Sequence, residues 1–113
     1  MATNMKRSKI HKFITTGAGN ISFTVTPGYA FRLVGAEIHL SAAGGANSMT
    51  ITRDSGDGAV YDTLLDSQDL TLLTDYVKTW DNLYGDADDS LVVAWTNGSS
   101  RTYGLTIRLE ELY

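Results

Sequence analysis

Nucleophilic catalysis is the first chemistry to test in this chain, which contains two histidines and no cysteine. A serine nucleophile needs a histidine aimed at its hydroxyl inside a cleft. His39 stands between Ile38 and Leu40 in an alternating run, so we expect its imidazole to face outward while its neighbours face the core. His11 lies in a separate N-terminal segment. These residues therefore predict no nucleophilic site.

Pairs of carboxylates are the second possibility, because two facing carboxyl groups can act as general acid and base. Nearly all of the aspartates fall in segments rich in Gly, Asn and Ser, where Asp commonly turns or caps the backbone. Glu37 lies within a strand-like run, and we expect it to face solvent. We therefore expect turn and solvation roles for the acids, and we expect the chain not to be an enzyme.

Two acidic loops place oxygen atoms closely, as calcium sites do. The first loop, DSGDG, contains Asp54 and Asp57, and the second, DADD, contains Asp86, Asp88 and Asp89. Neither loop has the spaced acids and the final bidentate Glu of the best-known calcium-binding loop. We expect no metal and no other cofactor, and a structural calcium, if one were bound, would use Asp54, Asp57, Asp86 and Asp88.

Aromatic rings offer a third kind of site, since exposed rings beside amides and acids can stack on sugars. Trp95 and Tyr103 have the parity of core residues. The rings that remain for a sugar platform or a subunit interface are Tyr76, Trp80, Tyr84 and Tyr113. A groove of exposed rings would favour carbohydrate binding, whereas a flat and self-complementary patch would favour assembly.

The elements that must position these residues are β-strands, because apolar and polar residues alternate with a period of two after residue 19. Turns such as Pro27-Gly28 separate the alternating runs. The seven or eight expected strands predict an antiparallel two-sheet β-sandwich of the jelly-roll type. A chain of 113 residues fits one such domain, to which we assign residues 13–113.

Three local features of this pattern can be checked. The inward parity changes between Leu33 and Ala36, so we expect a β-bulge at Val34-Gly35. The segment 59–67 is expected to be a strand whose inward residues begin at Val60 or Tyr61. The Asn-Gly pair at 97–98 predicts a hairpin between the last two strands.

Residues 1–12 differ from the rest of the chain, because they contain four Lys or Arg and no acid. Residues 13–113 contain thirteen Asp or Glu against five Lys or Arg, so we expect the folded domain not to bind nucleic acid. No apolar run is long enough to span a membrane or to act as the core of a signal peptide. We therefore expect a protein that is made and used without secretion.

We interpret residues 1–12 as an extended basic arm. The hypothesis is that this arm lies on a neighbouring subunit, because an extended segment can add a strand or an apolar anchor to a partner. Its partner-binding residues would be Lys6, Arg7, Lys9, Ile10, Lys12 and Phe13. The alternative is a solubilising tail without fixed structure.

The stretch between residues 27 and 107 resembles small β-sandwich virion proteins of tailed phages. The similar segments are PGYAFRL, HLSAAGG, TITRDSGDGAVYD and, later in the chain, AWTN and RTYGL. The resemblance implies a capsid decoration or cement protein or a tail accessory protein, and it brings no catalytic residues. It does not extend to the basic arm.

The resemblance also implies partners and a location. The partners would be the major capsid protein or other virion subunits, and the chain would be a homo-oligomer, with a trimer favoured. The protein would be assembled in the bacterial cytoplasm and would remain in the virion. The alternatives are a tail or connector accessory protein, or a carbohydrate-binding module used in host attachment.

Overall fold

A computed structural model describes residues 9–112 and shows an all-β chain with nine strands and one short 3-10 turn in this range. The elements are β1 (Lys9–Gly17), β2 (Ile21–Val25), β3 (Phe31–Leu40), β4 (Ser48–Asp54), η1 (Ala59–Tyr61), β5 (Thr63–Asp69), β6 (Asp75–Thr79), β7 (Tyr84–Gly85), β8 (Ser90–Trp95) and β9 (Tyr103–Glu111). No helix in the described range is long and apolar enough to cross a membrane.

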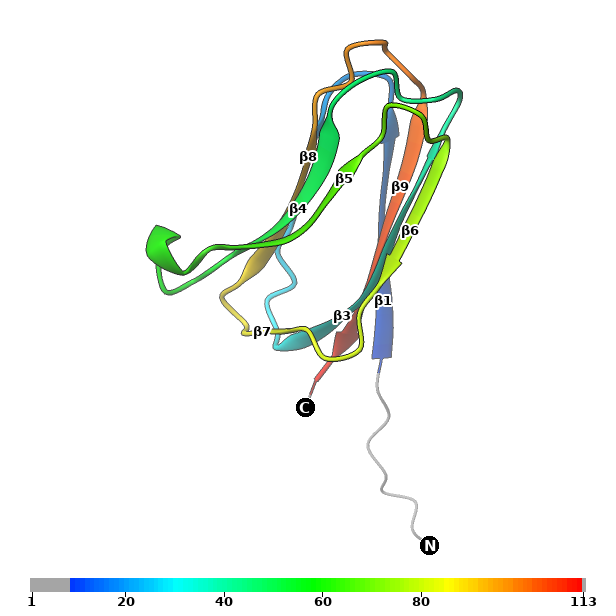
Figure 1. Cartoon of the computed structure of the whole chain (residues 1–113). Coiled ribbons are helices and arrows are strands. Elements are labelled where there is room, and N and C mark those ends of the chain that lie inside the picture. The colour runs from blue at the N-terminus through cyan, green and yellow to red at the C-terminus, as the bar shows by residue number, and fades with distance from the viewer. Residues whose placement is uncertain (1–8, 113) are drawn as a thin grey trace, which may run out of the picture.

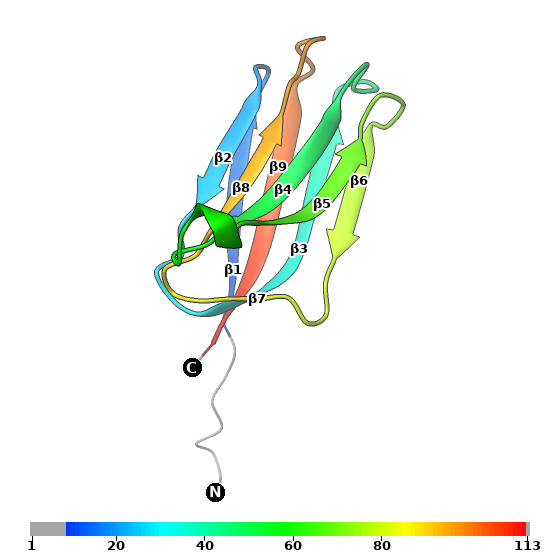
Figure 2. The ribbon, with the colours of Figure 1, turned by 60° about the vertical axis from the view of Figure 1, so that its left-hand side comes forward.

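The strands form two antiparallel sheets, with the orders β1-β9-β3-β6 and β2-β8-β4-β5 (Figures 1 and 2). The short strand β7 adds to the first sheet by pairing with β3. The pairs β1–β9, β2–β8, β3–β6 and β4–β5 are nested, as if a single long hairpin had been rolled up around its tip at β4–β5. This is the topology of a jelly roll, so the expected fold class is confirmed.

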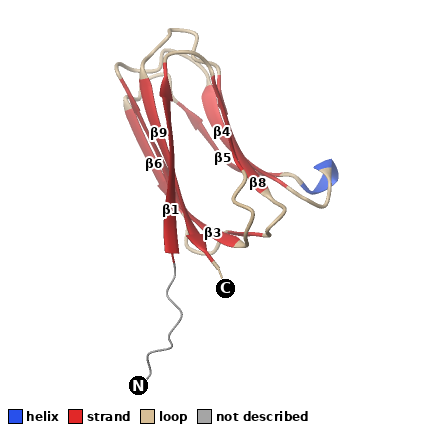
Figure 3. Cartoon of the chain, turned by 180° about the vertical axis from the view of Figure 1, so that it is seen from behind, coloured by secondary structure: helices blue, strands red, loops and turns tan. Residues whose placement is uncertain are grey.

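The core lies between the two sheets, which face each other in the view from behind and diverge toward the end that carries η1 (Figure 3). Alternate side chains of β3, β8 and β9 point into it, as the period of two predicts. Its buried apolar residues are Ile21, Val25, Phe31, Leu33, Ala36, Ile38, Leu40, Met49, Ile51, Leu70, Leu91, Val93, Trp95, Tyr103, Leu105, Ile107 and Leu109.

The bulge expected at Val34-Gly35 is confirmed. The register between β3 and β9 shifts between Leu33 and Gly35, so Val34 is the extra residue. Leu33 and Ala36 consequently both face the core, although two residues separate them. Thus the change of parity in the sequence correctly located an irregularity of the backbone.

Two other local predictions were wrong. Residues 59–61 form the turn η1 rather than the start of a strand, and Val60 and Tyr61 are exposed instead of inward-facing. The connection at Asn97-Gly98 is not a hairpin, because β8 belongs to one sheet and β9 to the other. Both errors arise from local signals, since apolar residues can occupy exposed turns and an Asn-Gly pair does not choose the partner strand.

Asn97 instead joins the two connections at the upper end of the sandwich in Figure 1. Its side-chain amide donates to the carbonyl oxygens of Ala18, Gly19 and Arg101, at 3.2, 3.1 and 2.8 Å. Its own backbone N–H donates to Oδ1 of Asn20 at 2.9 Å. Asn97 is buried, and these hydrogen bonds link the β1–β2 connection to the β8–β9 connection.

The N-terminal strand changes the boundary expected after residue 12. Lys9 to Lys12 belong to β1, which pairs with β9 from Lys9–Glu111 to Gly17–Tyr103. The described part of the arm is therefore extended, as predicted, but it belongs to the sheet of its own chain. Backbone pairing along nine residues gives the physical reason, because it satisfies N–H and C=O groups that a free arm would leave to water.

Candidate functional site

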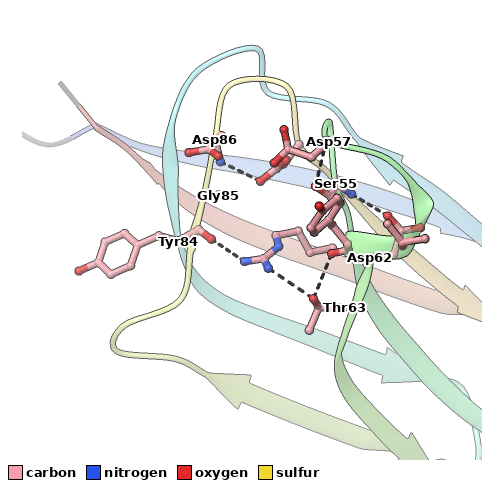
Figure 4. A pocket seen from close by; sticks show the side chains of 11 residues that line it. Ser55, Asp57, Asp62, Thr63, Tyr84, Gly85 and Asp86 are labelled. Atoms are coloured by element: carbon pink, nitrogen blue, oxygen red, sulfur yellow. Dashed lines mark hydrogen bonds between the residues drawn. The ribbon is translucent and has the colours of Figure 1, made fainter.

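A polar hollow opens at the lower end of the sandwich, between the β4–β5 connection and the segment of β7 (Figure 4). Its volume is about 470 Å³. The two connections come together because β4 and β8 pair side by side and β7 pairs with β3. The lining residues are Arg53, Ser55, Asp57, Val60, Tyr61, Asp62, Thr63, Tyr84, Gly85, Asp86 and Asp89. We call this feature the acidic hollow.

Asp89 is the structural carboxylate of the acidic hollow. It accepts hydrogen bonds from the backbone N–H groups of Gly56 and Asp86, both at 2.9 Å, and so ties the two connections together. Burial raises the pKa of Asp89, but these two amides and the charge of Arg53 outweigh burial and hold the pKa below its usual range. Asp89 is therefore charged at neutral pH, and its carboxylate is engaged by two backbone N–H groups of its own chain.

Asp62 and Arg53 are also largely engaged within the chain. Asp62 Oδ1 accepts the backbone N–H of Ser55 at 2.9 Å, which closes the turn before η1. The guanidinium of Arg53 donates to the carbonyl oxygen of Tyr84 at 3.0 Å and to Oγ1 of Thr63 at 3.4 Å (Figure 4). Arg53 therefore links β7 to the start of β5 by hydrogen bonds, and it makes no ion pair with a described carboxylate.

Asp57 and Asp86 differ from these residues, because their carboxylates have no hydrogen-bond or ion-pair partner among residues 9–112. Both side chains are exposed. Beside them stand two apolar side chains of η1, Val60 and Tyr61, with 89% and 60% of their surfaces exposed. The acidic hollow thus presents free negative charge next to uncovered apolar surface.

The positions proposed for calcium converge only in part. Asp57 and Asp86 line the acidic hollow, whereas Asp54 ends β4, where it is opposite Ser90. A Cβ placed on Gly56 would lie 2.3 Å from Cβ of Asp88, so the two loops are in close contact. Nevertheless, no group of three or more acids or histidines in the described range has an arrangement that could hold a metal ion.

The edge strand β1 is a second surface of interest. Its side chains Ile10 and Ile14 lie on the outer face of the sheet and expose 54% and 65% of their surfaces. A shallow hollow of about 310 Å³ adjoins Ile14, between β1 and β9. No other described strand pairs with the free edge of β1, so its backbone groups on that side remain available.

The arm residues are divided by this arrangement. Ile10 and Lys12 face outward from β1, and Lys9 is exposed at its start. The expectation that Phe13 anchors a neighbour is corrected, because its ring packs against the core of its own chain. Lys6 and Arg7 lie outside the described residues. Of the predicted anchors that the structure describes, Lys9, Ile10 and Lys12 are exposed.

His11, which sequence reasoning left without a role, fastens the start of β1. Its Nε2 lies 2.8 Å from Oε1 of Glu111 on the paired strand. Its ring also lies 5.1 Å from the ring of Tyr29, measured between centroids. The contact between the basic N-terminal strand and the acidic C-terminal strand thus forms within one chain.

The four candidate rings do not form a platform among the described residues. Tyr76 and Trp80 pack in part against the core, which leaves little ring surface for a sugar. Burial and the hydrogen bond from the Tyr76 hydroxyl to Asp66 raise the pKa of Tyr76 to about 12. Tyr84 is exposed, and its ring points away from the acidic hollow (Figure 4). Tyr113 lies outside the described residues.

His39 and Glu37 face outward, as expected, on the sheet that contains β3. His39 Nδ1 lies 2.6 Å from Oδ1 of Asp75, and both side chains are largely exposed. Glu37 accepts a hydrogen bond from Arg108 on the same face. Each forms a cross-strand pair on an open surface, which is an ordinary way to stabilise a sheet.

Comparison with known proteins gives the fold and no family. No protein-family model matches the chain, and no curated protein sequence matches it. Its structure is similar to the crystal structure of the Yersinia pseudotuberculosis-derived mitogen, with a TM-score of 0.51 and 11% sequence identity. The similarity covers 95% of this chain and 88% of the mitogen. At this identity the likeness concerns the β-sandwich alone.

Proposed function

We propose that this chain is a non-enzymatic structural protein of a tailed-phage virion, a capsid decoration or cement protein that stabilises the shell by contacts between subunits. The sequence resemblance to virion proteins supports this proposal. A jelly roll is compatible with it, although the fold serves many unrelated functions. A place in the tail or connector is the second form of the same proposal.

The observation that carries the proposal is the exposed apolar edge of β1. Natural edge strands are usually short, charged or covered, because a free edge recruits other chains. Strand β1 is nine residues long, no other described strand pairs with its outer edge, and Ile10 and Ile14 are exposed on either side of Lys12. A subunit that binds there would cover both isoleucines and extend the sheet.

The proposal is tested on virions of the phage that encodes the chain. The chain should sediment with purified particles, and particles made without it should release their DNA at a lower temperature. Adding the purified chain back should restore the heat resistance. Immunogold labelling of heads or tails would separate the decoration role from the tail role, and absence of the chain from mature particles would contradict both.

A pair of variants connects this test to β1. The double substitution Ile10→Lys and Ile14→Lys should abolish binding to particles, because it replaces apolar contact surface with charge. Ser22→Lys and Thr24→Lys are the matched control, since these two exposed side chains occupy corresponding outward positions on β2, the edge strand of the other sheet. Equal binding of the two double variants would exclude the β1 edge as the contact.

A further inference from the structure

We propose that the acidic hollow of one copy binds the basic segment of residues 1–8 of a second copy. This inference deepens the proposed function and rests on it, because it names one of the contacts by which the chain assembles. It concerns a different surface from the β1 edge and a defined occupant. Three features of the chain support it.

The first feature is the combination of free charge and apolar surface at the acidic hollow. The carboxylates of Asp57 and Asp86 have no partner among the described residues, and Val60 and Tyr61 expose most of their surfaces beside them. Exposed acids alone would simply be hydrated. The adjoining apolar side chains favour a ligand that carries both cations and aliphatic groups, as lysine and arginine side chains do.

The second feature is the composition of residues 1–8, which supply such a ligand. The segment MATNMKRS contains Lys6 and Arg7, two methionines and no acid. Its cations would meet Asp57 and Asp86, while Met5 and the stems of Lys6 and Arg7 would cover the apolar surface of η1. Much of the remaining chain is acidic and would be repelled from the hollow.

The third feature is the direction of β1. Lys9 pairs with Glu111 near the end of β9, so β1 begins at the end of its sheet. Eight extended residues span roughly 26 Å, which is enough to cross to an adjacent copy. The β4–β5 connection and β7, which line the acidic hollow, lie toward the same end of the sandwich as the start of β1 (Figure 1).

The hollow of the same chain is the competing acceptor. Lys9, Glu111, Phe31 and Gly85 occupy neighbouring strands in register, so Gly85 lies three strand spacings, roughly 14 Å, from Lys9. Eight extended residues can cover that distance, so the experiment below also tests for a contact within one chain. A contact between copies is head to tail and closes into a ring when the rotation between copies permits, in keeping with a homo-oligomer.

The absence of cysteine from the chain allows a clean crosslinking test. A chain with Ser8→Cys is mixed with a chain carrying Ala59→Cys, an exposed position next to Val60 in η1. Both substitutions preserve Lys6, Arg7 and the acids. The matched control replaces Ala59→Cys by Ser99→Cys, which is exposed at the upper end. Circular dichroism confirms that each variant is folded.

The mixed disulfide between Ser8→Cys and Ala59→Cys should form roughly tenfold faster than the control disulfide, because binding raises the local thiol concentration. Adding Asp57→Asn and Asp86→Asn, or high salt, should remove this advantage. Equal rates for the two pairs would overturn the proposal. So would a chain carrying both Ser8→Cys and Ala59→Cys that closes only an internal disulfide.

The purified chain is used in this test without any virion component. Its failure would therefore remove the contact between copies and leave binding to the shell to be decided by the particle experiment. Conversely, a chain that crosslinks as expected but never sediments with particles would retain the self-contact and lose the virion function.

Discussion

The two ends of the sandwich use polar residues in opposite ways. At the upper end, the buried side-chain amide of Asn97 donates hydrogen bonds to three carbonyl oxygens of its own chain. The connections 41–47 and 96–102 at this end contain no acid. At the lower end, the segments 54–62 and 80–89 contain three and four aspartates. The carboxylates of Asp62 and Asp89 accept backbone N–H groups, but those of Asp57 and Asp86 have no partner among the described residues.

This difference separates polar groups that hold the fold together from polar groups that remain available for binding. A buried group must be fully paired, or its desolvation destabilises the protein. An exposed carboxylate has no such requirement and contributes little to stability. The upper end is therefore expected to be sensitive to substitution, and the lower end to be tolerant wherever its acids are free.

The largest expected effect is at the upper end. Asn97→Ala should lower the free energy of unfolding by roughly 3 kcal/mol, because it leaves several buried backbone groups without partners. Urea unfolding followed by tryptophan fluorescence measures this change. Asn82→Ala is the matched control, since Asn82 is exposed, and a comparable loss in that variant would contradict the assignment.

A smaller effect is expected at Asp89, the paired acid of the lower end. Asp89→Asn should cost about 2 kcal/mol at pH 7, since the two backbone amides lose a charged acceptor. The pKa of Asp89 is lowered in the folded protein, so its stabilisation is complete above the unfolded pKa of about 3.9 and is lost as the pH falls through the folded pKa.

Unfolding of wild type and Asp89→Asn between pH 7 and pH 2.5 checks this linkage. The difference between their free energies of unfolding should shrink as the solution becomes acidic. A difference that is independent of pH would show that packing, rather than charge, accounts for the loss.

The smallest effect on stability is expected at the free acids. The double substitution Asp57→Asn and Asp86→Asn should change the free energy of unfolding by no more than about 0.5 kcal/mol, as exposed positions usually do. Thermal unfolding measures this value. A loss as large as that expected for Asp89→Asn would mean that these carboxylates are needed by the fold and would remove the contrast between free and paired acids.

The sequence predicted the sheets better than the ends. Period-two patterning identified most of the strands after residue 19 and the bulge at Val34, because each strand buries one face and parity records it. It did not predict that Lys9–Gly17 forms β1 within the same sheet. The pattern wrongly predicted that Val60 lies in a strand and that Asn97 lies in a hairpin, because contacts with distant segments determine the conformation of these turns. The acidic hollow joins loops about thirty residues apart in sequence, and they meet through the pairing of β4 with β8 and of β3 with β7.

Two glycines in the acidic loops are nevertheless a sequence feature that accompanies the close approach of other side chains to the backbone at the hollow. A Cβ on Gly85 would lie 2.2 Å from Cζ of Phe31, and one on Gly56 would collide with Asp88. Such close approaches require glycine, and each glycine stands within an acidic loop. No local pattern predicted which acids accept hydrogen bonds from backbone amides, because this depends on how the two loops pack against each other.

The solution mass of the purified chain, with and without residues 1–7, tests the central claim most directly. The truncation leaves β1 complete, because this strand begins at Lys9. Light scattering should show a closed oligomer for the full chain and a monomer with unchanged thermal stability for the truncated chain. A monomer in both cases, or the same oligomer in both cases, would contradict assembly through the basic segment.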